Sequence, residues 1–226
     1  MKTSDFLELC LSLPKSLWVS FHYFSWRKAL RLPILVRYNT SIKCLQGKII
    51  LSNDFADIKK PIIKFGFGHV GVFDKRYERS IWEVSGCIKV VGRVEMGHGS
   101  RLCVVHEGVL QFGKNFINTA KMTLICTDNI TFGNDVLTSW NTLIMDTDWH
   151  NTQTVSTGEL RPCHRPITFG NHIWIGTRAV ILKGTQIADG TIIGAGAIVT
   201  GKHGKPNVIL AGNPAKEVKD DITREY

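Results

Sequence analysis

The sequence of 226 residues lacks the marks of several protein classes. No two of its six cysteines lie within four residues of each other, which excludes a CxxC zinc or redox pair and leaves no disulfide framework. We expect reduced thiols in a cytoplasmic protein. No signal-peptide cleavage site follows an apolar run near the start, where Asp5 and Glu8 lie. The longest uncharged stretch there, residues 16–26, is about half the length of a membrane-spanning helix.

Acidic residues are too few to balance the basic ones. Lys and Arg number 28 against 19 Asp and Glu, so the formal net charge is +9. This excess suits an anionic partner such as nucleic acid, a phosphorylated cofactor or a lipid surface. No nucleic-acid-binding module or aromatic–basic repeat is present, so we expect no nucleic-acid partner. Hydrophobic residues at 43% predict a packed domain with at most a small appendage.

A repeat of six residues is the main pattern in the sequence. Residues 167–202 divide into ITFGNH, IWIGTR, AVILKG, TQIADG, TIIGAG and AIVTGK. The third place of every hexad holds a large apolar residue: Phe169, Ile175, Ile181, Ile187, Ile193 and Val199. A period of six fits neither an α-helix nor a single strand. It fits a solenoid, in which every sixth residue returns to the same side of the interior.

The same register occurs earlier in the chain and is interrupted once. The earlier third-place residues are Phe132, Thr138 and Ile144, and further back Val90, Met96 and Leu102 also lie six apart. The pattern stops between Thr147 and Ile167. We expect the inserted loop 148–166 to carry a site, because a non-repeating insertion in a regular scaffold usually does.

These hexads, followed by VILAGNPAKEV, resemble the hexapeptide-repeat acyltransferases, and most of all their maltose, galactoside and capsular-polysaccharide O-acetyltransferase branch. The resemblance is strong over 129–218 and weaker over 88–128. It implies an all-β solenoid, a left-handed parallel β-helix. We expect this helix over 46–212, after an N-terminal helical cap or membrane-proximal segment over 1–45 and before a short helical tail over 213–226.

The resemblance also implies a function. The family consists of homotrimers that bind acetyl-CoA in a groove between two parallel coils. In this family a histidine serves as general base for direct transfer of the acetyl group to an acceptor hydroxyl. We therefore expect an acetyl-CoA-dependent O-acetyltransferase acting on a sugar hydroxyl of a surface polysaccharide or its precursor.

His150, in MDTDWHN, is the expected general base, because the family's catalytic histidines lie at this distance before the IWIG hexad. Imidazole, with an ordinary pKa of about 6.5, suits removal of a proton from a hydroxyl near neutral pH. Asp148 or Asp146 would accept a hydrogen bond from the other ring nitrogen, and we favour Asp148. His164, in RPCHRP, is a rival base, although its two flanking arginines would lower its pKa.

The residues expected to bind the cofactor are assigned by their positions in the family motif. The expected contacts are Trp174, Gly176, Thr177, Gly194, Ala195, Thr200, Lys202 and Lys216. Trp174 matches the family tryptophan that lines the pantetheine groove. The small residues at 194–196 would let the backbone approach the pantetheine arm. The family usually has Lys directly after the threonine at position 200, whereas Gly201 intervenes here.

The sequence gives less specific evidence for the residues that bind the acceptor. The expected contacts of the sugar acceptor are Asp128, Asn118, Asp146 and Arg165.

The N-terminal segment has two interpretations. Its aromatic residues and the arginines and lysines that follow them would suit peripheral contact with a membrane. It would equally cap the open end of the solenoid against edge pairing, and we favour the cap.

Two other functions stay open from the sequence. A γ-type carbonic anhydrase on the same coil would need three histidines around zinc, and His98, His106, His150 and His172 are candidates. The zinc-histidine spacing of that family is not evident, so we expect no metal. A non-catalytic scaffold would have uninterrupted coils, and the long insertion argues against it.

Overall fold

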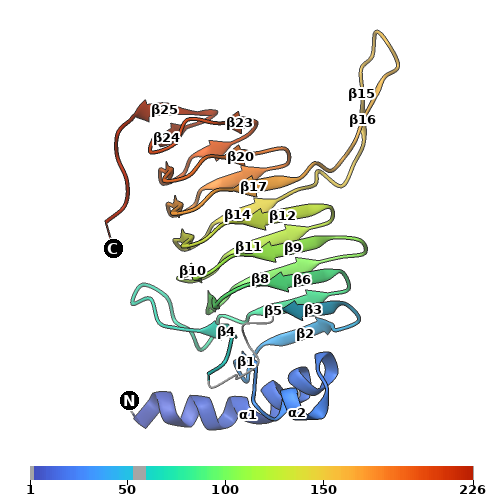
Figure 1. Cartoon of the computed structure of the whole chain (residues 1–226), viewed down its shortest axis with the longest axis vertical. Helices are drawn as coiled ribbons and strands as arrows, with labels where there is room; N and C mark the ends of the chain where they lie inside the picture. Colours follow the sequence, from blue (N-terminus) through green and yellow to red (C-terminus); the bar gives the residue numbers. More distant parts are fainter. Residues whose placement is uncertain (1–2, 53–59, 226) are drawn as a thin grey trace.

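The chain winds through three sheets in turn. The computed structural model describes residues 3–52 and 60–225. Each turn of the chain adds one strand to each sheet, so strands far apart in sequence become parallel neighbours (Figure 1). The result is a three-sided parallel β-solenoid, as the period of six predicts.

The strands are distributed over the three sheets as follows. The first sheet contains β1 Ile34–Val36, β4 Ile63–Phe67, β7 Val94–Gly97, β10 Phe116–Asn118, β13 Leu137–Thr138, β18 Trp174–Ile175, β21 Ile192–Ile193, β24 Ile209–Gly212 and β25 Ala215–Lys219. The second contains β2 Ser41–Cys44, β5 Ile81–Val84, β8 Arg101–Val104, β11 Thr123–Cys126, β14 Leu143–Met145, β19 Val180–Leu182 and β22 Ile198–Val199. The third contains β3 Lys48–Leu51, β6 Cys87–Val90, β9 Val109–Phe112, β12 Asn129–Phe132, β17 Ile167–Phe169, β20 Gln186–Ile187 and β23 Lys202–His203.

The interior is built from the third-place residues of the hexads. All six over 167–202 are buried, and so are the earlier ones in the same register, which confirms the predicted core. Along the third sheet, the rings of Phe112, Phe132 and Phe169 stack nearly parallel, with centroids 5.3 and 4.8 Å apart. Each turn therefore buries its apolar row against the next one.

Glycines let successive turns approach closely at the corners. A Cβ atom on Gly113 would lie 2.5 Å from the carbonyl oxygen of Gly133, and one on Gly133 would lie 2.4 Å from that of Gly170. A real Cβ atom does not fit at such distances, so the spacing of the turns requires glycine in this column.

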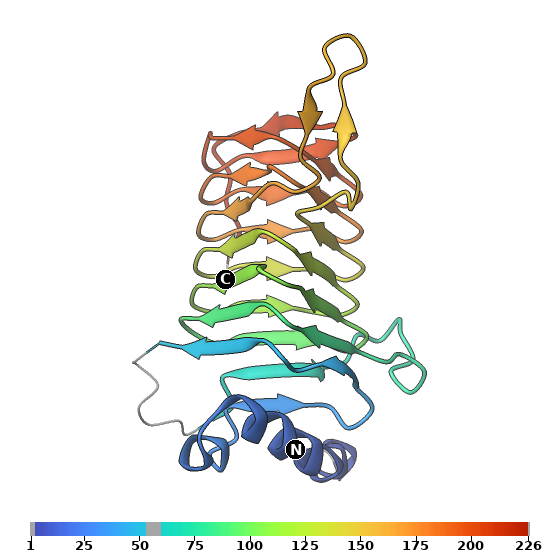
Figure 2. The same ribbon diagram turned by 90° about the vertical axis from the view of Figure 1, so that its right-hand side faces the viewer.

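The N-terminal helices close one end of the solenoid. Helix α1, Thr3–Tyr23, crosses this end, and the short α2, Trp26–Ala29, follows it (Figures 1 and 2). The N–H of Val36 donates to Ser16 Oγ over 2.9 Å, and the hydroxyl of Ser20 donates to the Ile34 carbonyl over 3.3 Å. Serines of α1 thus satisfy the free edge of β1. The coil begins with β1, before the expected boundary at residue 46.

The predicted helical tail over 213–226 is wrong. Residues 215–219 form β25, which folds back antiparallel on β24. Lys205 fastens it through ion pairs with Glu217 at 2.5 Å and Asp220 at 2.8 Å. The open edge of the last first-sheet strand offers backbone hydrogen bonds that an isolated helical turn would not have.

Within the part of the chain that the structure describes, two segments leave the regular coil. The expected insertion is an arm in which β15, Thr152–Gln153, pairs antiparallel with β16, Leu160–Arg161 (Figure 2). A second segment, residues 68–80 between β4 and β5, was not predicted as an insertion. We call these the arm and the side loop.

Candidate functional site

The predicted site residues lie at two corners of the solenoid. The turns between the first and second sheets form one, which we call the 1–2 corner. The turns between the second and third sheets form the 2–3 corner, and the arm leaves the coil there, between β14 and β17. The second sheet separates the two corners.

His150 lies in the arm, just beyond a short ladder that forms the arm's base. The N–H of Asp148 donates to the Cys163 carbonyl over 2.7 Å, and the N–H of Arg165 donates to the Asp146 carbonyl over 3.0 Å. His150 follows this ladder with its side chain exposed to solvent, and the rival base His164 is also exposed. The ladder therefore places His150 where an external hydroxyl can reach it.

Asp148 has a partner that sequence reasoning missed. Its carboxylate pairs with Lys183 Nζ at 2.5 Å, and the same ammonium group donates to the Pro162 carbonyl over 2.9 Å. Lys183 follows β19 on the next turn of the coil. One lysine thus ties both strands of the arm's base to the solenoid. The only hint in the sequence was that Lys183 lies on the turn next to the insertion.

Asp146, one of the expected acceptor contacts, is used within the coil itself. Its side chain is fully buried and accepts hydrogen bonds from the N–H groups of Thr127 at 2.8 Å and Asp128 at 2.9 Å. The Thr127 hydroxyl donates a third bond. The carboxylate holds the turn before β12, which would otherwise bury unpaired N–H groups. Asp128 stays half-buried at this turn, and Arg165 is exposed at the arm's base.

Asn118, another expected acceptor contact, lies almost wholly inside the coil at the edge of a cavity described below. Its side chain is only 3% exposed and lies inside the 1–2 corner. The oxygen accepts from the Ser100 hydroxyl at 2.9 Å, and the amide donates to Thr138 Oγ1 at 2.8 Å. Ser100, Asn118 and Thr138 come from successive turns, so they form a polar ladder in the interior. The hydrogen-bonding groups of the Asn118 side chain are satisfied within this ladder.

Most of the predicted cofactor residues form one strip along the 1–2 corner. Trp174 is 38% exposed, and its indole N–H donates to Ser139 Oγ over 3.3 Å. Gly176 is buried beside it, and the hydroxyl of Thr177 donates to the Trp140 carbonyl over 2.9 Å. The next turn presents residues 194–196, where Gly194 is half-buried while Ala195 and Gly196 are exposed. We call this surface the corner strip.

The remaining cofactor candidates lie elsewhere. Thr200 is exposed at the 2–3 corner, and Lys202 is exposed on β23 of the third sheet. Both lie on the side of the solenoid from which the arm leaves. Lys216 is exposed on β25 at the end of the first sheet. A single chain therefore does not bring His150 together with the corner strip, because the second sheet lies between them.

The side loop runs up the 1–2 corner toward the corner strip. The Phe73 ring lies 6.4 Å from that of Trp140, and Lys121 Nζ lies 4.5 Å from the Phe73 centroid. Glu78 pairs with the same lysine at 2.7 Å. The loss of hexad register over residues 68–80 was the sequence signal for this loop.

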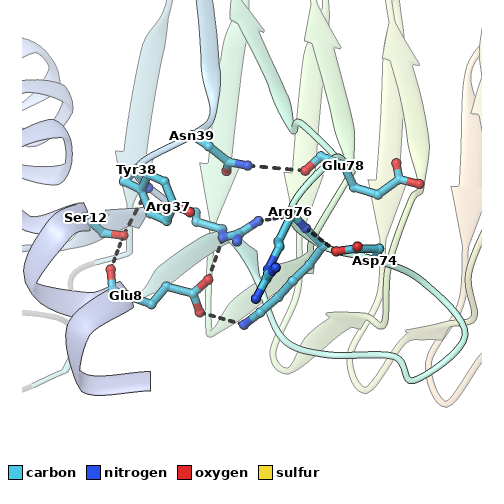
Figure 3. A network of polar contacts seen from close by, with 9 residues as sticks. Glu8, Ser12, Arg37, Tyr38, Asn39, Asp74, Arg76 and Glu78 are labelled. Atoms are coloured by element: carbon cyan, nitrogen blue, oxygen red, sulfur yellow. Dashed lines mark hydrogen bonds and ion pairs between the residues drawn. The ribbon is translucent and has the colours of Figure 1, made fainter. Parts of the chain in front are cut away.

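An ion-pair network anchors the side loop to the N-terminal helix (Figure 3). Arg37, which is 2% exposed, pairs with Glu8 at 2.6 Å and donates to the Lys75 carbonyl over 2.9 Å. Lys75 pairs with the other oxygen of Glu8 at 3.1 Å. The side loop, the turn after β1 and helix α1 are thereby held as one unit.

The start of the side loop and the outer face of the first sheet line a half-open cavity of about 420 Å³. Its polar lining includes His69, Thr119 and the ion pair between Lys64 and Glu95, which are 3.0 Å apart. The cavity lies on the first sheet, the sheet that also carries Trp174.

His98, one of the four zinc candidates in the sequence, is a buried histidine beneath the side loop. Its ring is fully buried, and within residues 3–52 and 60–225 neither ring nitrogen has a hydrogen-bond partner. Phe73 packs against it with centroids 6.0 Å apart. Burial, and next the charge of Arg37, lowers the pKa of His98.

The described part of the chain contains no group of three or more His, Cys, Asp and Glu side chains placed to hold a metal ion. None of its helices is both long and apolar enough to cross a bilayer. All six cysteines are unpaired.

Comparisons with known proteins give relatives in one class. No family model matches the chain. It is 35% identical to the galactoside O-acetyltransferase of Escherichia coli K12 over 117 residues, which cover 51% of this chain and 56% of the relative. It is 28% identical to a putative lipopolysaccharide biosynthesis O-acetyltransferase of the same organism over 131 residues, 54% of this chain and 66% of the relative. The match thus spans between half and two thirds of the length of these relatives.

Solved structures share the fold. The polysialic acid O-acetyltransferase OatWY has a TM-score of 0.54 at 19% identity, covering 85% of this chain and 87% of that one. The polySia-specific acetyltransferase NeuO has a TM-score of 0.51 at 19% identity, covering 86% and 79%. Together with the sequence relatives, they confirm the resemblance to the hexapeptide-repeat acetyltransferases.

Proposed function

We propose that the protein is an acetyl-CoA-dependent O-acetyltransferase that acts on a sugar hydroxyl of a surface polysaccharide or its precursor, with His150 as general base. The named relatives acetylate galactosides and polysialic acid or are assigned to lipopolysaccharide synthesis, which supports a sugar acceptor. The proposal includes a left-handed coil and a homotrimer, as the family resemblance implies, and a cytoplasmic location, as the unpaired cysteines suggest.

One observation carries the proposal. An exposed histidine lies at the 2–3 corner, and an exposed strip of Trp174, Thr177 and small residues lies at the 1–2 corner of neighbouring turns. When parallel copies pack around a threefold axis with their second sheets facing that axis, the 2–3 corner of one meets the 1–2 corner of the next. Each interface then holds one histidine and one corner strip, and a trimer closes three such sites.

The chemistry follows from this arrangement. The pantetheine arm would lie along the corner strip, where residues 194–196 leave room for it. His150 accepts the proton of the acceptor hydroxyl as its oxygen attacks the thioester carbonyl. The tetrahedral intermediate then collapses, the bond from carbon to sulfur breaks, and the imidazolium returns its proton to the departing thiolate. Lys183 and Asp148 hold the arm that positions the histidine.

The acceptor would enter from the side-loop end of the strip. The cavity of about 420 Å³ lies there, on the first sheet below Trp174, and is large enough for one or two sugar units. His69, Thr119, Lys64 and Glu95 offer the polar groups that sugar hydroxyls bind.

Subunit complementation tests this function. The His150→Ala and Trp174→Ala variants are each mixed with a panel of sugars and assayed for thiol release from acetyl-CoA. Each variant alone should be inactive, while co-refolded mixtures should regain activity in about a quarter of their sites, because mixed interfaces combine one intact histidine with one intact strip. Full turnover by the His150→Ala variant would refute the mechanism. Absence of recovery in verified mixed oligomers would refute the shared site.

A further inference from the structure

The outward face of helix α1 carries large apolar side chains that nothing in the chain covers among the described residues. The exposed fractions are 60% for Leu7, 53% for Leu11, 54% for Trp18 and 46% for Phe21. These residues recur at spacings of three, four and seven, so they form one stripe along the helix. We call them the apolar stripe.

Helix α1 exposes its apolar face and buries a face rich in serine, unlike an ordinary surface helix. Its fully buried residues are Ser12, Ser16, Ser20 and Val19, and the serines bond to the edge strand β1 and to Tyr38 just after it. At about 100° per residue, this face lies on the opposite side of the helix from the apolar stripe. A surface helix normally buries its apolar face, so an exposed stripe of this kind marks an interaction surface.

Exposed basic and apolar residues follow the apolar stripe in the chain. In and after α2, Trp26 and Leu30 are 61% and 58% exposed, and Arg27 and Lys28 are exposed between them. The Arg27 guanidinium lies 5.2 Å from the Trp26 ring. Tryptophan, phenylalanine and leucine combined with arginine and lysine are the composition of helices that lie in the interface of anionic membranes.

The position of the helix suits a flat partner. Both views place α1 across the end of the solenoid, with the coil rising from one side of it (Figures 1 and 2). The apolar stripe faces away from β1, so a planar surface can meet it without meeting the coil. A second copy is a poorer occupant, because it would oppose the exposed Arg27 and Lys28 of two chains that each carry a net charge of +9.

We propose that α1 and α2 dock the protein on the surface of an anionic lipid bilayer, with the apolar stripe buried at the headgroup boundary. The inference stands on the helix alone and is independent of the acetyl-transfer function. The serine face closes the solenoid while the opposite face binds lipid, so the two interpretations of the N-terminal segment apply to opposite sides of one helix.

Vesicle flotation of the full chain tests the proposal. The probes are vesicles of phosphatidylglycerol and phosphatidylethanolamine, and vesicles of phosphatidylcholine alone. We expect flotation with the anionic vesicles and about tenfold weaker partitioning for the Trp18→Ser/Phe21→Ser variant. The Arg27→Gln/Lys28→Gln variant should lose about tenfold with anionic vesicles and little with phosphatidylcholine. The matched control is Val155→Ser/Leu160→Ser, which removes two apolar side chains of the arm that are more exposed than Trp18 and Phe21, and it should float like the parent.

Three outcomes would overturn the proposal. The first is no flotation of the parent protein with anionic vesicles. The second is unchanged flotation of the Trp18→Ser/Phe21→Ser variant with an unchanged circular dichroism spectrum. The third is self-association of the parent that this variant abolishes without any lipid binding, which would assign the apolar stripe to a second copy.

Discussion

Lys183 holds the carboxylate of Asp148 at 2.5 Å and, through the Pro162 carbonyl, the opposite strand of the arm's base. The lysine is 19% exposed, so water screens this pair less than it would a pair on the open surface. The pair joins residues from neighbouring turns of the coil. It places the arm, and with it His150, relative to the rigid solenoid.

The Lys183→Met variant should therefore loosen the arm without unfolding the coil. We expect faster proteolysis within residues 150–162 and a fall in acetyl-transfer kcat of about tenfold or more, because a small misplacement of the base is costly. The matched control is Lys205→Met, which removes an ion-paired lysine at the tail. Equal proteolysis and equal kcat in the two variants would contradict this role.

The solenoid was predictable because its period is local. Phe169 and Ile175 are buried because every third-place residue of a hexad points into the interior. The sequence shows this pattern in six consecutive hexads. The pair between Lys183 and Asp148 was not predictable in this way. It depends on which turn lies beside the arm, and this follows only from the paired strands. The burial of Asn118 and Asp146 was not predictable either, because a polar side chain inside a corner looks the same in sequence as one on the surface.

Glycine at position 133 should be essential for the spacing of the turns. In the Gly133→Ala variant, the new Cβ would lie 2.4 Å from the Gly170 carbonyl oxygen. We expect the free energy of unfolding to fall by about 1–3 kcal/mol in urea titrations. The Gly204→Ala control adds a methyl group where nothing lies within 4 Å and should change stability by less than about 0.5 kcal/mol. An equal effect of both would contradict the account of the corner column.

The serine face of α1 should contribute to stability through the edge of β1. The Ser16→Ala variant leaves the buried N–H of Val36 without its acceptor at 2.9 Å. We expect a loss of about 1–3 kcal/mol in the free energy of unfolding. Ser156→Ala, at the exposed tip of the arm, is the control and should be neutral. A neutral Ser16→Ala variant would show that β1 does not need this cap.

His98 should make stability depend on pH. Its folded-state pKa is lowered by burial and by Arg37, His69 and Lys75, while Glu78 acts in the opposite direction. The unfolded chain therefore binds the proton first, at about pH 6.5, and stability falls as the pH drops below that value toward the lowered pKa. The slope from this residue is at most about 1.4 kcal/mol per pH unit. Urea titrations from pH 7.5 to 5 should show a flatter profile for His98→Leu, and parallel profiles would contradict this.

The side loop shows a second reason why part of the site could not be predicted. Residues 68–80 carry no repeat, so their sequence does not say where they lie. Phe73 reaches Trp140 only because the loop runs along the 1–2 corner, past the turns between them. Contacts of this kind depend on the path of a loop, whereas the core depends on the period of the strands.

Calorimetric titration of acetyl-CoA into the wild-type protein and the His150→Ala variant tests the central claim most directly. The account predicts saturable binding at about one site per chain for both proteins, because the corner strip and not the base holds the cofactor. The variant should then fail to transfer the acetyl group. No binding by the wild-type protein at millimolar acetyl-CoA would contradict the proposed function.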